Sequence, residues 1–372
     1  MAGIYIHVPF CKRICSYCDF YKSTLTAIIP EYIPAVKREL ELRRTYLQNE
    51  SIDTVYFGGG TPSLMSSEQI EDIIDRIKSL YPVSDDCEIT VEANPDDLTA
   101  GYLSELSRTH VNRLSIGIQS FNDRDLQVLN RRHNALQALV SIEQARRAGF
   151  RNISIDLIYG IPGMTNDEWY RNLITVPEVE HISAYHLTVE PGTALFRKVR
   201  EGLLVVPVED ESYAQFFTLR KFAEDRKMIH YEISNLAKEG YYSTHNTAYW
   251  QRKKYLGVGP SAHSYDQRSR QWNIRDIREY IEKVNVGFPA YESEELSEAD
   301  HFNEYLMVSL RTIWGADQDV ILGKFGPAFY SRLLKSVSPY LNSGHIIHEG
   351  GFYKMTAPGW LISDLILAHL IT

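Results

Sequence analysis

Three of the four cysteines in this 372-residue chain lie within eight residues, in the segment CKRICSYC. Cys11, Cys15 and Cys18 have the spacing C-x3-C-x2-C. Structural zinc takes four tetrahedral ligands, and no fourth cysteine or histidine stands at a usual spacing here. A disulfide would leave one thiol over and is rare in a reducing compartment. Three thiolates can instead hold a four-iron cluster with one iron open to a substrate or cofactor; a zinc site is the alternative.

A second set of polar residues follows successive β-branched runs. The loop GGGTP contributes Gly59, Gly60 and Thr61, and it lacks the Gly-Lys-Ser/Thr of a P-loop. The others are Glu92, Gln119, Arg131 and Asp156. Each alone is typical of a strand end or a helix cap. Together they offer an arginine for a carboxylate, and carboxylates and an amide for hydroxyl or amino groups.

The elements that must position these residues alternate along the first two-thirds of the chain. Strands are predicted at 3–8, 54–59, 88–93, 113–119, 153–160 and 182–190. Amphipathic helices are predicted at 31–48, 67–81, 99–109, 135–149, 166–176 and 210–228, with caps near Ser67, Thr99 and Asn166. This alternation predicts parallel strands with right-handed crossovers. Six units favour an open, partial TIM-like (β/α)6 barrel whose ligands gather at the carboxyl ends of the strands.

The pattern changes after about residue 230, so three domains are predicted. Residues 1–230 form the barrel with its cysteine loop. Residues 231–297 form a segment rich in aromatic residues and histidine that packs on the barrel. Residues 298–372 form an α+β, winged-helix-like domain with a hairpin at Gly350-Gly351. Cys87 begins the strand-like run CEITVEA and is predicted to be a core residue.

Charge and hydropathy exclude some classes of function. The net charge is −9 and the isoelectric point is about 5.8, which argues against a nucleic-acid-binding surface. The first residues do not have the pattern of a signal peptide. No apolar run approaches the ~20 residues of a membrane-spanning helix. We therefore expect a cytoplasmic protein without an integral membrane segment.

The cysteine spacing, with Tyr17 before the third cysteine, resembles the radical S-adenosylmethionine (SAM) superfamily, in which SAM chelates the open iron through its amino and carboxylate groups. The segments YIHVPFCKRICSYCDF, GGGTPSL, VEANP, SIGIQSF, DLIYGIPG and LTVEPGT resemble the oxygen-independent coproporphyrinogen oxidases and their haem-chaperone relatives over nearly the whole chain. The resemblance implies a [4Fe-4S] cluster on the three cysteines. It also implies SAM contacts at Tyr5, Gly59, Gly60, Thr61, Glu92, Gln119, Arg131 and Asp156.

Two departures separate the branches of this family. The oxidases have a further cysteine two residues after the third, where this chain has Phe20. The segment HNTAYW (245–250) resembles the H-N-x-x-Y-W motif of the haem-chaperone branch, which implies haem binding with His245 as the iron ligand. A neutral imidazole can ligate haem iron; the alternative is a histidine packed in an aromatic loop. His263 matches a family histidine without an assigned role.

The main hypothesis is a haem chaperone that binds a [4Fe-4S] cluster, SAM and haem, and delivers haem to a haem-requiring protein. The expected partners are haem, an acceptor that belongs to the respiratory chain and is membrane-bound, an electron donor and a second copy of the chain, but no nucleic acid. The alternative is a radical SAM oxidative decarboxylase of coproporphyrinogen III, so enzymatic activity stays open. A zinc-binding module with a winged-helix interaction domain is the third hypothesis.

Overall fold

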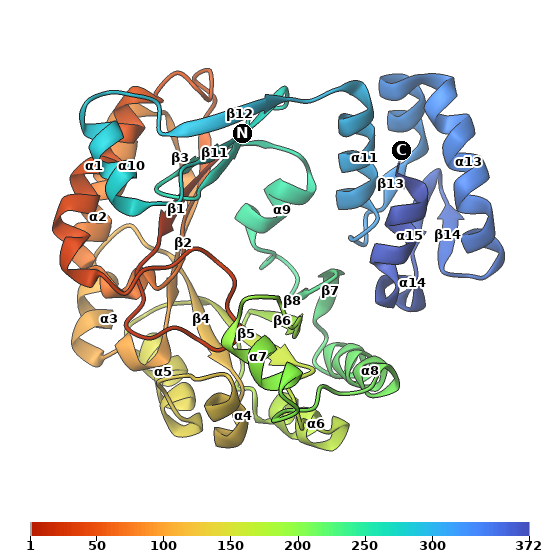
Figure 1. Ribbon diagram of the computed structural model, residues 1–372, viewed down its shortest axis with the longest axis horizontal. Helices are drawn as coiled ribbons and strands as arrows, with labels where there is room; N and C mark the ends of the chain where they lie inside the picture. The colour runs from red at the N-terminus through yellow and green to blue at the C-terminus, as the bar shows by residue number, and fades with distance from the viewer. Residues whose placement is uncertain (1, 372) are drawn as a thin grey trace.

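A computed structural model describes residues 2–371, and its centre is one twelve-stranded sheet (Figure 1). The strand order is β12-β11-β10-β9-β1-β2-β3-β4-β5-β6-β8-β7. Six neighbouring strands are parallel, namely β1 (Ala2–Val8), β2 (Ile52–Gly59), β3 (Val83–Ala93), β4 (Arg113–Gln119), β5 (Asn152–Tyr159) and β6 (His181–His186). All six predicted strands are therefore present, and the open (β/α)6 fold is confirmed.

The helices of the crossovers pack around this sheet (Figure 1). They are α1 (Ile29–Leu42), α2 (Ser67–Leu80), α3 (Ala100–Leu106), α4 (Asp123–Val128), α5 (Ala135–Arg147), α6 (Asn166–Thr175), α7 (Ala194–Arg200) and α8 (Glu209–Asp225), with short 3-10 turns η1 (Thr26–Ile28), η2 (Pro62–Leu64) and η3 (Pro95–Asp97). Helix α2 shows why they pack. Its Ile70, Ile73, Ile74 and Ile77 are buried, and they lie on one helical face.

The starts of three helices test the predicted caps. Thr99 accepts a hydrogen bond from the Tyr102 amide, as expected. The cap of α2 is Ser66 and not Ser67, because the hydroxyl of Ser66 accepts from the Gln69 amide. The cap of α6 is likewise Thr165 and not Asn166. In both cases the residue one position earlier has the extended backbone that lets its side chain reach the third helical amide.

The sheet continues beyond the parallel strands at both edges. Antiparallel strands β8 (Asn235–Ala237) and β7 (Ile229–Glu232) follow β6. On the other side β9 (Lys254–Val258) pairs parallel with β1, and β10 (His263–Tyr265), β11 (Ser269–Asn273) and β12 (Tyr291–Glu295) follow antiparallel. Helices α9 (Thr244–Trp250) and α10 (Ile277–Asn285) connect these strands. Much of 231–297 therefore extends the sheet itself; the domain limits stay a prediction.

The carboxyl-terminal part is a separate α+β layer (Figure 1). It contains α11 (Glu298–Ser309), β13 (Ala316–Asp317), α12 (Gln318–Val320), a π-helical turn η4 (Ile321–Phe325), α13 (Gly326–Asn342), β14 (Ile346–Glu349), β15 (Phe352–Met355), α14 (Ala357–Leu361) and α15 (Ser363–Leu370). Gly350 and Gly351 both have positive φ, as a two-residue hairpin turn requires. The short strand β13, which the sequence did not indicate, completes a three-stranded sheet. Across residues 2–371 no helix combines the length and apolarity needed to cross a bilayer.

Candidate functional site

The cysteine loop follows β1 and is held from three sides by backbone hydrogen bonds. The Cys11 amide donates to the Ser23 carbonyl at 2.9 Å, which closes the loop on itself. The Ser16 amide donates to the Leu129 carbonyl at 3.0 Å, next to the end of α4. The Leu195 amide of α7 donates to the Ser16 carbonyl at 2.8 Å. These three hydrogen bonds tie the backbone of the loop to neighbouring parts of the chain.

The three cysteines are free thiols with polar neighbours. Cys11 is buried, and Cys15 and Cys18 are partly exposed. The Thr61 hydroxyl donates to Cys11 Sγ at 3.6 Å, and Arg131 Nη1 donates to Cys15 Sγ at 3.2 Å. Burial raises the pKa of both Cys11 and Cys18, so without a metal these thiols hold their protons. Metal binding would displace the protons and place negative sulfur beside donors that already point at it.

The positions of the three cysteine sulfurs bear on whether they could share a single metal ion. Ligand atoms bound to one zinc ion at about 2.3 Å cannot lie more than about 4.6 Å apart. Within residues 2–371, the only three cysteine, histidine or carboxylate ligand atoms within 4.8 Å of one another belong to Glu71, Asp75 and His110. The three cysteine sulfurs are therefore spread more widely than one ion allows. Three thiolates are the ligand set that leaves one iron of a [4Fe-4S] cluster without a protein ligand.

The glycine loop after β2 lies against the strand that leads into the cysteine loop. Gly59 has φ +105°, and its amide donates to Glu92 Oε2 at 3.2 Å. A Cβ on Gly60 would lie 2.7 Å from the Phe10 carbonyl oxygen and 2.8 Å from that of Val8. These are backbone atoms that cannot rotate away. Only glycine at this position lets the two loops approach and brings Thr61 to Cys11.

Two buried carboxyl groups lie on neighbouring parts of the sheet, Glu92 next to the end of β3 and Asp156 within β5. Glu92 accepts a hydrogen bond from the Tyr56 hydroxyl at 2.9 Å, and Asp156 accepts from the Ser115 hydroxyl at 3.2 Å. Burial and the nearby Asp156 carboxylate raise the pKa of Glu92 to about 7. Burial raises the pKa of Asp156 to about 6. Both groups are therefore poised to be ionised by a cationic or hydroxyl-bearing ligand near neutral pH.

Arg131 joins this site to the cysteines. Its Nη2 donates to Asn94 Oδ1 at 2.5 Å and to the Gly117 carbonyl at 2.8 Å, and its buried Nε has no hydrogen-bond partner. Gln119, with φ +67°, lies alongside, because a Cβ on Gly117 would be 3.0 Å from Gln119 Nε2 and 3.2 Å from Arg131 Nη2. An unpartnered guanidinium N–H beside the cysteine loop suits a ligand carboxylate.

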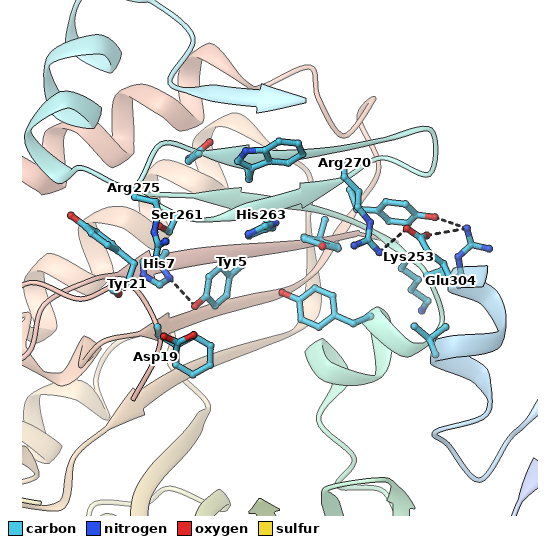
Figure 2. A pocket seen from close by; sticks show the side chains of 18 residues that line it. Tyr5, His7, Asp19, Tyr21, Lys253, Ser261, His263, Arg270, Arg275 and Glu304 are labelled. Carbon is cyan, nitrogen blue, oxygen red and sulfur yellow. Dashed lines mark hydrogen bonds and ion pairs between the residues drawn. The ribbon is translucent and has the colours of Figure 1, made fainter. Parts of the chain in front are cut away.

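The structure therefore brings most of the predicted residues to one end of the sheet. Tyr5 lies on the adjacent strand β1, where its hydroxyl is 3.2 Å from His7 Nδ1 (Figure 2). The sequence analysis missed Asn94, whose amide donates to Thr61 Oγ1 at 3.2 Å and whose carbonyl accepts from Arg131. Its position directly after β3, in VEANP, was the available signal. Cys87 is buried in the core, as predicted.

His245 is placed differently from the expected iron ligand. It lies on α9 in the interior, 2% exposed, and its ring stacks on Tyr56 with centroids 4.9 Å apart. Its Nδ1 is 2.8 Å from Thr54 Oγ1 and its Nε2 is 2.8 Å from the Tyr249 hydroxyl. Burial lowers the pKa of His245 to about 3. Both ring nitrogens are occupied, so in this conformation His245 offers no free nitrogen to an iron.

The chain is similar to known proteins in sequence and in fold. The family model "Radical SAM superfamily" matches residues 5–173. The chain is 35% identical to "Heme chaperone HemW" of Bacillus subtilis, over 100% of this chain and 99% of that protein. It is 32% identical to the protein of the same name from Mycobacterium tuberculosis, over 99% of this chain and 94% of that protein. Among solved structures, the radical SAM enzyme coproporphyrinogen III oxidase HemN of Escherichia coli shares the fold, with a TM-score of 0.87 and 22% identity over 100% of this chain and 90% of that chain.

Proposed function

This chain belongs to the HemW family of radical SAM proteins, and from that membership we propose that it binds haem and delivers it to haem-requiring proteins. The observation that carries the proposal is the end-to-end match to relatives that are named haem chaperones. The cysteine loop supports the same branch. Phe20, which is 71% exposed, occupies the position of the fourth cysteine expected of the oxidases.

The resident cofactors of the proposal are a [4Fe-4S] cluster on Cys11, Cys15 and Cys18, and SAM. When bound, the cluster supplies an open iron for the amino and carboxylate groups of SAM and a path for electrons. The chain's own residues position the nucleoside. Arg131 would pair with the SAM carboxylate through its unpartnered N–H, as the geometry of the site supports.

The other proposed SAM contacts divide by chemistry. Glu92 and Asp156 would accept hydrogen bonds from amino or hydroxyl groups of the ligand. A positively charged amino group nearby would favour loss of the protons from both carboxyl groups. Gly59, Gly60 and Thr61 would approach the ligand through their backbone, because a glycine carries no Cβ to hold it away. Tyr5 and Gln119 complete the set of proposed contacts.

The partners follow from the chaperone role. We propose an acceptor in the respiratory chain, reached at the membrane surface, and an electron donor for the cluster. A homodimer of the chain is a further proposal, as is a cytoplasmic location.

An anaerobic titration of cluster-reconstituted protein with haemin, followed by the Soret band, tests the function. Saturable binding near one haem per chain is the expected result. A Cys15→Ser variant measured in parallel shows whether the cluster is needed. Absence of saturable binding, together with turnover of coproporphyrinogen III, would overturn the proposal in favour of the oxidative decarboxylase.

A further inference from the structure

A pocket of about 610 Å³ lies beside the cysteine loop (Figure 2). His245 does not line it and lies behind Tyr5 and Tyr249, which do. Its floor is Tyr5 and His7 of β1, and one side is the segment Asp19–Tyr21 that directly follows Cys18. Strands β9, β10 and β11, the turn after α9, and α11 provide the remaining walls. This volume lies within the range of pockets that hold organic ligands of moderate size.

Aromatic side chains form a large part of the pocket walls, together with charged ones. Tyr249 and Tyr255 meet edge to face with centroids 4.6 Å apart, and Tyr265 and Trp272 continue the surface along β10 and β11. Phe20 lies at the cysteine-loop side. Rings of this kind bind large, flat, apolar ligands, because stacking and edge contacts add to the burial of area.

One histidine faces this pocket with its ring free. His263 of β10 is directly opposite Trp272 of β11, so the two side chains share one face of the sheet. Among residues 2–371 no hydrogen-bond partner contacts its ring, whereas both nitrogens of His7 are engaged, by the Tyr5 hydroxyl and the Tyr21 carbonyl. Burial and the charge of Arg270 lower the pKa of His263, so its imidazole is neutral and has a lone pair available.

Cationic groups stand on both sides of His263 (Figure 2). Arg270 is paired with Glu304 at 2.7 Å. Arg275, at the opposite end, is exposed and has no carboxylate within ion-pair distance among the described residues. A flat ligand over Trp272 would therefore meet a nitrogen ligand near its centre and an available guanidinium at one edge. This is the arrangement that an iron porphyrin with propionate groups requires.

We propose that this pocket receives haem, with His263 as the iron ligand and Arg275 as the partner of a propionate. The assignment rests on the proposed haem-chaperone function and replaces His245 as the ligating residue. It also places the haem next to Asp19–Tyr21, so the cargo touches the same loop that carries the cluster cysteines.

The ligand is tested by haemin titration of wild type, His263→Ala and His245→Ala, with His348→Ala of the exposed β14 hairpin as the control. His263→Ala is expected to shift the Soret band and weaken haemin binding about tenfold or more. Its affinity for iron-free protoporphyrin IX, followed by fluorescence, should stay unchanged, because only the bond to iron is lost. His348→Ala should match wild type.

The proposed pairing of Arg275 with a haem propionate is tested with Arg275→Glu. Arg268→Glu is the control, because it makes the same charge change on the β10–β11 turn outside the pocket. Arg275→Glu is expected to weaken haemin but not haemin dimethyl ester, whose propionates carry no charge. Equal effects of the two variants would overturn the role of Arg275. Wild-type spectrum and affinity in His263→Ala would overturn the site assignment alone, whereas failure of wild-type protein to bind haemin would overturn the proposed function itself.

Discussion

Replacing Glu92 with glutamine tests the electrostatics of the candidate SAM site in the metal-free, ligand-free protein. Burial, and then the negative charge of Asp156, raise the pKa of Glu92 from 4.5 to about 7. Glutamine keeps one oxygen, which can accept from the Gly59 amide, but its NH2 group takes the place of the carboxylate oxygen that accepts from the Tyr56 hydroxyl. The substitution therefore removes the ionisation and one hydrogen-bond acceptor, and the cost of the lost acceptor does not vary with pH.

The direction of the effect follows from proton linkage. The folded state binds the Glu92 proton more tightly than the unfolded chain, so stability is complete below the unfolded pKa of 4.5 and falls as pH rises through about 7. At 1.36 kcal/mol for each pKa unit, the loss amounts to roughly 3 kcal/mol above that window. Glu92→Gln cannot lose this stability. Its stability relative to wild type should therefore rise by roughly 3 kcal/mol between about pH 4 and pH 8.

Urea denaturation of both proteins across this pH range measures the difference in unfolding free energy. Glu143→Gln serves as the control, because Glu143 is a surface carboxylate paired with Arg147. Its curve should run parallel to that of wild type. If the Glu92→Gln curve also ran parallel, or if the wild type gained stability relative to it with rising pH, the account of the buried carboxyl pair would be refuted.

Three further substitutions test the fold and the cluster loop. Gly60→Ala should lower the unfolding free energy by about 1–3 kcal/mol through overpacking, and it should lower the iron content after reconstitution. The control Gly101→Ala should do neither, because its added Cβ meets nothing closer than 4.0 Å. Equal melting temperatures and iron contents for the two variants would contradict this prediction. Trp169→Ala removes a fully buried indole that donates to the Gln215 carbonyl, and thermal melting should report a loss of about 3–5 kcal/mol. Cys15→Ser should abolish iron and sulfide binding while Cys87→Ala leaves both intact, and iron retained by Cys15→Ser would argue against the three-cysteine site.

The sequence predicted the parallel part of the fold well because each unit is local. A β-branched run, a polar loop and an amphipathic helix recur within short stretches, and only right-handed crossovers join them. The residues that cap the helices were harder to predict from the sequence. Ser66 and Ser67 have the same side chain, and only the backbone conformation decides which one caps α2.

The strands beyond β1 could not be predicted in the same way. β9 is short, and its partner β1 lies some 250 residues earlier in the chain, so no local pattern reveals the pairing. The two histidines show the same limit at the site. The partner of His245 Nδ1 is Thr54, 191 residues away. The role proposed for His263 depends on a pocket that several distant elements form. A motif identifies a residue type, whereas long-range packing decides whether its nitrogen is free.

The place of β1 in the sheet also has a consequence for synthesis on the ribosome. β1 is translated before its neighbour β2, but its other neighbour, β9, ends only at Val258. Until then one side of β1 exposes unpaired amide and carbonyl groups, the kind of edge on which nascent chains associate. In the finished protein the outermost strand on that side is β12, which carries the exposed Glu292, Glu294 and Glu295. A nascent chain that stalls before β9 would thus present a bare edge, while the completed one presents a line of negative charge that repels a second sheet.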